Sequence, residues 1–328
     1  MNPIVKNFQF MLENVIKRKR NQDLLITTDS HIRSVHIGQA AMEAARSMGI
    51  QAVIATMETR THQGQEPPAA ISAAMKQVGA IIDIAETVNL GHTTARKDAT
   101  ALGIGYYVLC TDVSEDYFMR PLSIEDLEQI KKRSEKIADL MTKADTARMT
   151  TRFGTNITMS LKGRKALPLH PLTELAVTAI PDTAETAIAP VEGSTEGVIV
   201  ADASVRGWGK LLRSPLKFEV SHGRVAIDSV RSDIQEEADK FRQLLRLDEN
   251  AVNCAAELGI GTSHLVPKSL GGSFLLDYSV VGTFHVAVGR NNDIGGQTHS
   301  TLHQDVLMTG GTIYLDDLCI MKDGELQI

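Results

Sequence analysis

Short apolar runs alternate with helical patterns over residues 23–144, and this alternation constrains the fold more than any other feature of the sequence. Strands rich in apolar and β-branched residues are predicted at 24–28, 52–55, 80–84 and 106–109. Helical spacing lies between them, at 35–48, at 69–76 and after His92. Strands that are apolar along their length and separated by helices form parallel sheets covered on both faces. The sequence therefore predicts an α/β domain, and the lack of a Gly-x-Gly-x-x-Gly turn after its first strand argues against a nucleotide site.

The pattern changes to β-structure after a long charged helix predicted over residues 123–143, with Ser123 as its N-cap. The later predicted strands are 149–153, 156–161, 197–201, 218–221 and 225–227, followed by a helix near 234–245 and a last block of strands. A chain of 328 residues is long enough for two cores. We therefore expect an N-terminal α/β domain over 1–147, beginning with an amphipathic helix within 1–20, and a C-terminal α+β domain over 148–328. The proline-rich stretch 162–190 is expected to be a mobile crossing.

Charge and composition exclude several classes of function. Lysine and arginine total 34 against 40 acidic residues, so the chain has no bulk attraction for nucleic acid or for an anionic membrane. The sequence shows neither an apolar run of about 18 residues nor a signal-peptide pattern. Its three cysteines are far apart, which is typical of reduced thiols. We expect a cytoplasmic protein that acts on a small molecule.

The strongest signal for chemistry is the pair His303 and Asp305, two residues apart in a predicted strand. Because residues i and i+2 of a strand point to the same face, the imidazole and the carboxylate should lie side by side. Both groups bind divalent metals, but a metal site needs more than two converging ligands. The further candidates nearby are Glu257, His264 and His285. We predict a mononuclear divalent-metal site within residues 253–305.

Each further candidate has an alternative interpretation. A buried Glu257 requires a cation or a donor, and this partner need not be a metal. His285 can equally be a core histidine bonded to a backbone carbonyl. His264 completes a face of two histidines and one carboxylate if the metal is iron, whereas zinc or a metal pair would need Glu257 and His285.

Other residues are candidates for contact with substrate. His92 begins a helix at the carboxyl end of a predicted parallel strand, where open α/β sheets bind ligands, and its imidazole can carry a proton. Arg96 or Lys97 can hold an anion near this helix start, although both can also be plain solvated cations. Arg152 is a second candidate for an anion clamp, and His299 is a candidate at the edge of the substrate site.

Several separated segments of the chain resemble the aminopeptidase T superfamily, which also contains iron-dependent 2,5-dihydroxypyridine 5,6-dioxygenases. The C-terminal segments are 256–262, 282–289, Gly295-Gly296 and His303-Gln304-Asp305. The others are Glu66-Pro67-Pro68, 92–97 and 189–197, so the resemblance spans nearly the whole chain.

The two branches of the superfamily imply different roles for these residues. The peptidase branch implies metal positions at Glu257, His285, His303, Asp305 and also Glu185. That branch also needs an acidic base, for which Asp277 is available at a shifted position. The dioxygenase branch implies two histidines and an aspartate around Fe(II), with His264, His303 and Asp305 in these places and His92 as the acid–base residue. The resemblance further implies a homo-oligomer.

We therefore predict a non-haem Fe(II) dioxygenase of aromatic catabolism that uses O2 to cleave the ring of a small hydroxylated aromatic compound or hydroxypyridine. The alternative is a metal-dependent aminopeptidase or related hydrolase, with zinc, cobalt or manganese activating water. A third interpretation is a protein that kept the fold and lost catalysis, and the intact His303 and Asp305 count against it.

Overall fold

The chain divides into two compact units. The computed structural model describes residues 2–18, 23–61, 64–111, 115–172, 177–179, 182–254 and 256–328. Unit 1 comprises Met1–Lys131 and His170–Asp182, and unit 2 comprises Lys132–Leu169 and Thr183–Ile328. The division falls within helix α6 (Ile124–Lys143), whereas the predicted domain boundary after residue 147 lies further along, in strand β5.

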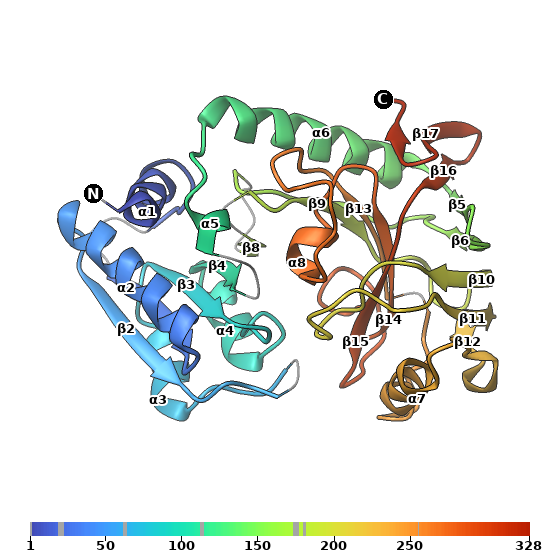
Figure 1. Cartoon of the computed structure of the whole chain (residues 1–328), viewed down its shortest axis with the longest axis horizontal. Coiled ribbons are helices and arrows are strands. Elements are labelled where there is room, and N and C mark those ends of the chain that lie inside the picture. The colour runs from blue at the N-terminus through green and yellow to red at the C-terminus, as the bar shows by residue number, and fades with distance from the viewer. Residues whose placement is uncertain are drawn as a thin grey trace. The chain divides into compact units, whose positions relative to one another are not determined.

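Unit 1 is built on a five-stranded parallel sheet in the order β2-β1-β3-β4-β8. Its strands are β1 (Leu24–Asp29), β2 (Ala52–Met57), β3 (Ala80–Ala85), β4 (Gly105–Cys110) and β8 (Val177–Ala179). Its helices are α1 (Pro3–Asn14), α2 (Ile32–Ser47), α3 (Ala69–Met75), α4 (Thr94–Ala101) and α5 (Glu115–Phe118) (Figure 1). The predicted parallel pairing is confirmed, because β1 pairs in parallel with both β2 and β3, and β3 with β4. Of the helix predicted within 1–20, residues 1, 19 and 20 lie outside the described residues.

Unit 2 contains two antiparallel sheets. The strands of the larger sheet are β5 (Thr146–Thr151), β6 (Asn156–Ser160), β10 (Glu196–Ala201), β11 (Leu216–Ser221), β12 (Arg224–Val225), β16 (Gly311–Leu315), β17 (Leu318–Lys322) and β18 (Glu325–Leu326). They lie in the order β12-β11-β10-β6-β5-β16-β17-β18. The strands of the smaller sheet are β7 (Leu167–Leu169), β9 (Glu185–Ile188), β13 (Glu257–Gly261), β14 (Phe284–Gly289) and β15 (His303–Met308). They lie in the order β15-β14-β13-β9-β7. The remaining elements are the 3-10 turn Ile227–Ser229 and helices α7 (Gln235–Leu244) and α8 (Phe274–Asp277).

One continuous core in unit 2 includes side chains from both sheets. Phe218 of β11, Ile157 of β6 and Phe284 of β14 are fully buried in it, together with Phe241 of α7. This core fixes the inner face of the smaller sheet, so the polar side chains of that sheet hold definite positions.

The stretch 162–190 was expected to be a mobile crossing, but it contains the strands β7, β8 and β9. β9 pairs antiparallel with β7 and with β13, although its composition hides the strand signal. Residues 173–176 and 180–181 of this stretch lie outside the described residues. Among the helices that are described, none is long and apolar enough to cross a bilayer.

Candidate metal centre

Five acidic and imidazole side chains meet on one face of the smaller sheet of unit 2. Glu185 begins β9, Glu257 begins β13, and His285 is the second residue of β14. His303 and Asp305 are the first and third residues of β15, so they share a face, as predicted. The antiparallel register sets the four strands side by side and brings these positions together.

Gly259 makes room for this cluster. It pairs with Ala187 on one side and with His285 on the other. A Cβ atom on Gly259 would lie 2.0 Å from Cε1 of His285 and 2.8 Å from Oε2 of Glu185. A side chain at this position would therefore displace the imidazole and the carboxylate, so glycine is required here for space.

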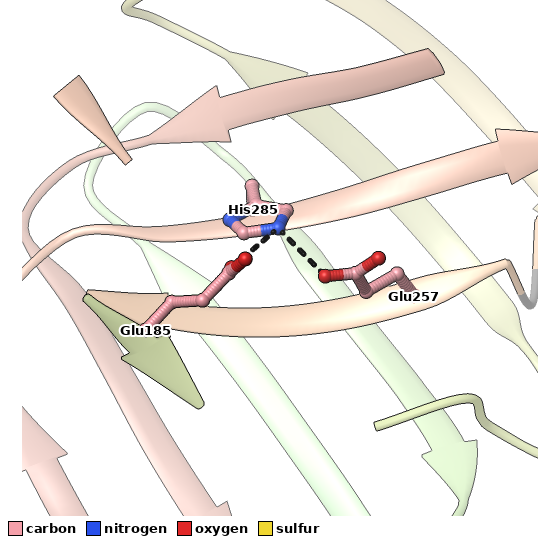
Figure 2. A group of neighbouring side chains, drawn as sticks. All are labelled: Glu185, Glu257 and His285. Carbon is pink, nitrogen blue, oxygen red and sulfur yellow. Dashed lines mark hydrogen bonds and ion pairs between the residues drawn. The ribbon is translucent and has the colours of Figure 1, made fainter. Parts of the chain in front are cut away.

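Glu257 lies at the centre of the cluster. Its Oε1 is 3.3 Å from Nε2 of His285, and its Oε2 is 3.3 Å from Nε2 of His303. Nε2 of His285 also lies 3.3 Å from Oε2 of Glu185. Figure 2 shows the imidazole of His285 between the two glutamate side chains. Nε2 of His303 lies 3.3 Å from Oδ1 of Asp305. Two groups of potential ligands therefore share Glu257, and the ligand atoms within each group lie within 4.8 Å of one another.

Burial makes the charges of this cluster mutually dependent. Burial raises the pKa of Glu185 to about 8, and the nearby charge of Glu257 adds to the shift. Burial alone would lower the pKa of His285, but the carboxylates of Glu185 and Glu257 outweigh it and raise the pKa to about 9. Burial opposes ionisation of Asp305 as well, yet His303 and the guanidinium of Arg206 hold its pKa well below the usual range. A buried set of carboxylates of this kind favours a bound cation.

Two oxygens of the cluster are buried and accept no hydrogen bond from the described residues: Oε2 of Glu185 and Oδ1 of Asp305. His303 donates its Nδ1–H to the carbonyl oxygen of Arg290 at 2.7 Å, which turns the other ring nitrogen toward the cluster. Metal-bound histidines are held in this way, because the second nitrogen then offers its lone pair to the metal. Buried polar atoms normally have hydrogen-bond partners, whereas each of these oxygens has, in the described part of the chain, only an imidazole Nε2 at 3.3 Å and no hydrogen bond, which suits binding of a divalent cation. The residues fit such an ion.

His264 lies outside this cluster. β13 ends at Gly261, and the chain beyond it carries His264 to an exposed position with Nδ1 3.4 Å from Nη1 of Arg133. Neither group of potential ligands includes it. The iron hypothesis gave His264 as the third ligand beside His303 and Asp305. In the structure the residue beside these two is Glu257.

Arg152 and His299 are exposed and belong to neither group of potential ligands. Arg152 lies between β5 and β6, with its guanidinium 4.9 Å from the centre of the Phe153 ring. The backbone carbonyl of His299 accepts a hydrogen bond from Asn250 at 2.9 Å, in the segment between β14 and β15. Substrate contacts for both residues stay predictions.

His92 and Lys97 belong to unit 1. Lys97 lies in α4, and the first backbone N–H groups of this helix, those of Thr94 and Ala95, are donated to the carboxylate of Glu66. An anion bound at this helix start would therefore compete with a carboxylate of the chain itself. The roles of His92 and Lys97 stay predictions.

Asp277, the candidate base of the peptidase branch, holds a turn in the structure. Its Oδ1 and Oδ2 accept the backbone N–H groups of Gly271 and Gly272, each at 2.9 Å. Its side chain is also almost completely buried. The carboxylate is therefore engaged in stabilising the segment before α8.

Arg206 is a residue of this centre that the sequence interpretation missed. Its Nη1 donates to Oδ2 of Asp305 at 3.0 Å, and its backbone N–H donates to the backbone carbonyl oxygen of Asp305 at 3.2 Å. The available signal was an arginine in the glycine-containing segment that follows the apolar strand β10. That signal is weak, because nothing local shows that this segment returns to β15.

Comparison with known proteins decides the family. A family model described as 2,5-dihydroxypyridine 5,6-dioxygenase matches residues 5–328. The chain belongs to this family. Membership confirms the predicted resemblance and indicates an enzyme. The matched residues extend over both units.

Two solved structures share the fold of this family member. The 2,5-dihydroxypyridine dioxygenase from Pseudomonas putida aligns with a TM-score of 0.79 at 17% identity, covering 98% of this chain and 96% of that chain. AmpT from Thermus thermophilus aligns with a TM-score of 0.73 at 16% identity, covering 99% of each chain. No curated protein matches the sequence. These likenesses confirm the α/β fold class.

Proposed function

We propose that this protein is an Fe(II)-dependent dioxygenase that cleaves the ring of a small hydroxylated aromatic compound or hydroxypyridine. The observation that carries the proposal is the buried group Glu257, His303 and Asp305 in a chain that matches the dioxygenase family model almost throughout. A few imidazole and carboxylate ligands suit non-haem iron, since they leave positions for substrate and O2. Bound Fe(II) would supply the electron transfer to O2 that no side chain can provide.

The residues around the metal position orient the ligands in this proposal. The carbonyl of Arg290 fixes the ring of His303, and Arg206 fixes one oxygen of Asp305. Burial strengthens the electrostatic interactions of the centre, because little water screens them. We propose His92 as the residue that takes and returns the hydroxyl proton of the substrate, on the family resemblance alone.

Oxygen uptake tests this proposal. Protein reconstituted with Fe(II) under anaerobic conditions should consume O2 when 2,5-dihydroxypyridine or a related hydroxylated ring is added, with loss of the ring absorbance. His303→Ala should lose both iron and uptake, whereas Glu219→Gln, a change at an exposed position on β11, should retain both. Iron-loaded, folded protein that consumes no O2 with a panel of such rings would contradict the proposal.

The position of Glu257 favours a second candidate, a hydrolase with two divalent ions. The carboxylate of Glu257 belongs to both groups of potential ligands, and a shared carboxylate suits two ions roughly 4 Å apart. Zinc, cobalt or manganese would then lower the pKa of a bound water. Asp277, the base predicted for this reaction, accepts hydrogen bonds from two backbone N–H groups, which counts against this candidate. Two ions per chain with cobalt-dependent release of an N-terminal residue, and no O2 uptake, would replace the first proposal.

Assembly and location also stay proposals. We expect a homo-oligomer, on the superfamily resemblance, and light scattering of the purified protein would measure its mass. We also expect a cytoplasmic location, which cell fractionation would test.

A further inference from the structure

Arg206 lies in a segment that is fastened to β15, the strand that carries His303 and Asp305. Val205 forms an antiparallel bridge with Val306, and the backbone N–H of Arg206 donates to the carbonyl of Asp305. Nε2 of Gln304 donates to the carbonyl of Arg206 at 2.9 Å. These contacts hold the base of the arginine side chain in register with the candidate ligands His303 and Asp305.

Most of the hydrogen-bonding capacity of Arg206 is uncommitted. A guanidinium has five N–H donors, and only Nη1 of Arg206 meets an acceptor among the described residues, at Oδ2 of Asp305. The side chain is 23% exposed, whereas that of Asp305 is 2% exposed. The guanidinium therefore joins a buried ligand on one side to an accessible space on the other. Its planar fork matches the two oxygens of a carboxylate or a single ionised hydroxyl.

Aromatic side chains lie beside the same centre. The rings of Phe274 and Tyr278 lie 5.7 Å and 5.6 Å from the imidazole of His285, measured between ring centres. Phe274 is buried, but Tyr278 is only partly buried and is close enough to Arg206 to interact with it electrostatically. A cation beside aromatic rings is a suitable environment for a flat aromatic anion.

We infer that Arg206 binds an anionic oxygen of the substrate, a ring carboxylate or an ionised ring hydroxyl, and so selects aromatic anions. The inference rests on the proposed function, because it assumes that the substrate reacts at this centre. It assigns to Arg206 the task that the sequence interpretation gave to Arg152 or Lys97. Arg152 is exposed and covers Phe153, which makes it a poorer anchor.

Binding of two isosteric probes tests the inference without turnover. Benzoate and benzamide differ mainly in charge, and calorimetry on the zinc-loaded protein avoids redox chemistry. The native protein should bind benzoate more tightly than benzamide. Arg206→Gln should weaken benzoate binding about 10- to 100-fold and leave benzamide unchanged, since a hydrogen bond to a charged group is lost. Arg206→Lys should retain part of the preference, because it keeps the charge but not the fork.

Arg224→Gln is the matched control, because Arg224 is exposed on β12 and donates to the carbonyl of Glu249. It should bind both probes like the native protein. An unchanged preference for benzoate in folded Arg206→Gln, or no preference in the native protein, would overturn the inference. Failure of the native protein to bind any divalent ion would instead refute the proposed function. The same comparison of probes on metal-free protein would then decide the role of Arg206 by itself.

Discussion

Glu257→Gln should weaken metal binding strongly, because both groups of potential ligands use this carboxylate. The change keeps the shape of the side chain and removes its charge. Loss of a residue that only orients a metal ligand costs about 10- to 100-fold in affinity, so loss of a direct ligand should cost at least about 100-fold. At a metal concentration of about 100 times the native Kd, binding stabilises the native protein by about 2.7 kcal/mol. For the variant, the same metal concentration would be close to its Kd, so binding would stabilise it by only about 0.4 kcal/mol.

Thermal unfolding with and without Zn(II) measures this difference. Because 1 kcal/mol corresponds to about 2–4 °C in a large domain, the metal should raise the Tm of the native protein by about 5–11 °C and that of Glu257→Gln by about 1–2 °C. Glu219→Gln on β11 is the matched control and should respond like the native protein. A native-sized rise in the Glu257 variant would refute the assignment of this carboxylate as a shared ligand.

The contacts of the candidate ligands and of Asp277 give three further predictions. His303→Ala should abolish metal retention, whereas His264→Ala should leave it unchanged, since only His303 lies in a ligand group; elemental analysis of desalted protein distinguishes them. Metal affinity should rise with pH between about 6 and 9, because the metal displaces protons from Glu185, whose pKa burial raises to about 8, and from His285, whose pKa the neighbouring carboxylates raise to about 9 against the effect of burial. Calorimetry in buffers of different ionisation enthalpy would count these protons, and an affinity independent of pH would contradict the arrangement. Asp277→Ala should destabilise the protein by about 2 kcal/mol, because two backbone N–H groups lose their acceptor; urea unfolding measures this loss, and a value below about 0.5 kcal/mol would count against it.

Local periodicity was sufficient to predict most of the strands of unit 1 and the strand that carries His303 and Asp305. The apolar runs of unit 1 correspond to β1, β2, β3 and β4. β1 and β3 are buried along their whole length, as strands covered on both faces must be, whereas the edge strand β2 is partly exposed. The last block of strands that the sequence predicted corresponds to β13, β14 and β15 of the smaller sheet, together with the strands that follow them. The pairing of His303 with Asp305 followed from the two-residue period of a strand alone.

Long-range pairing was beyond the reach of local periodicity. Glu185 reaches the centre only because β9 pairs with β13, some 70 residues away in the chain, and the sequence around β9 has no clear strand pattern. Arg206 reaches the centre because its segment pairs with β15, through the bridge between Val205 and Val306 and the hydrogen bonds beside it, some 100 residues away in the chain. The sequence interpretation placed His264 with the ligands because it follows a glycine-rich turn. In the structure this side chain is exposed and belongs to neither group of potential ligands.

Anomalous diffraction from crystals saturated with metal tests the centre most directly. We predict an anomalous peak bonded to Nε2 of His303 and Oδ1 of Asp305, with Glu257 as a further ligand and His264 unbound. A metal-saturated crystal with no peak at these atoms, or with the ion held by His264, would contradict the assignment of the metal centre.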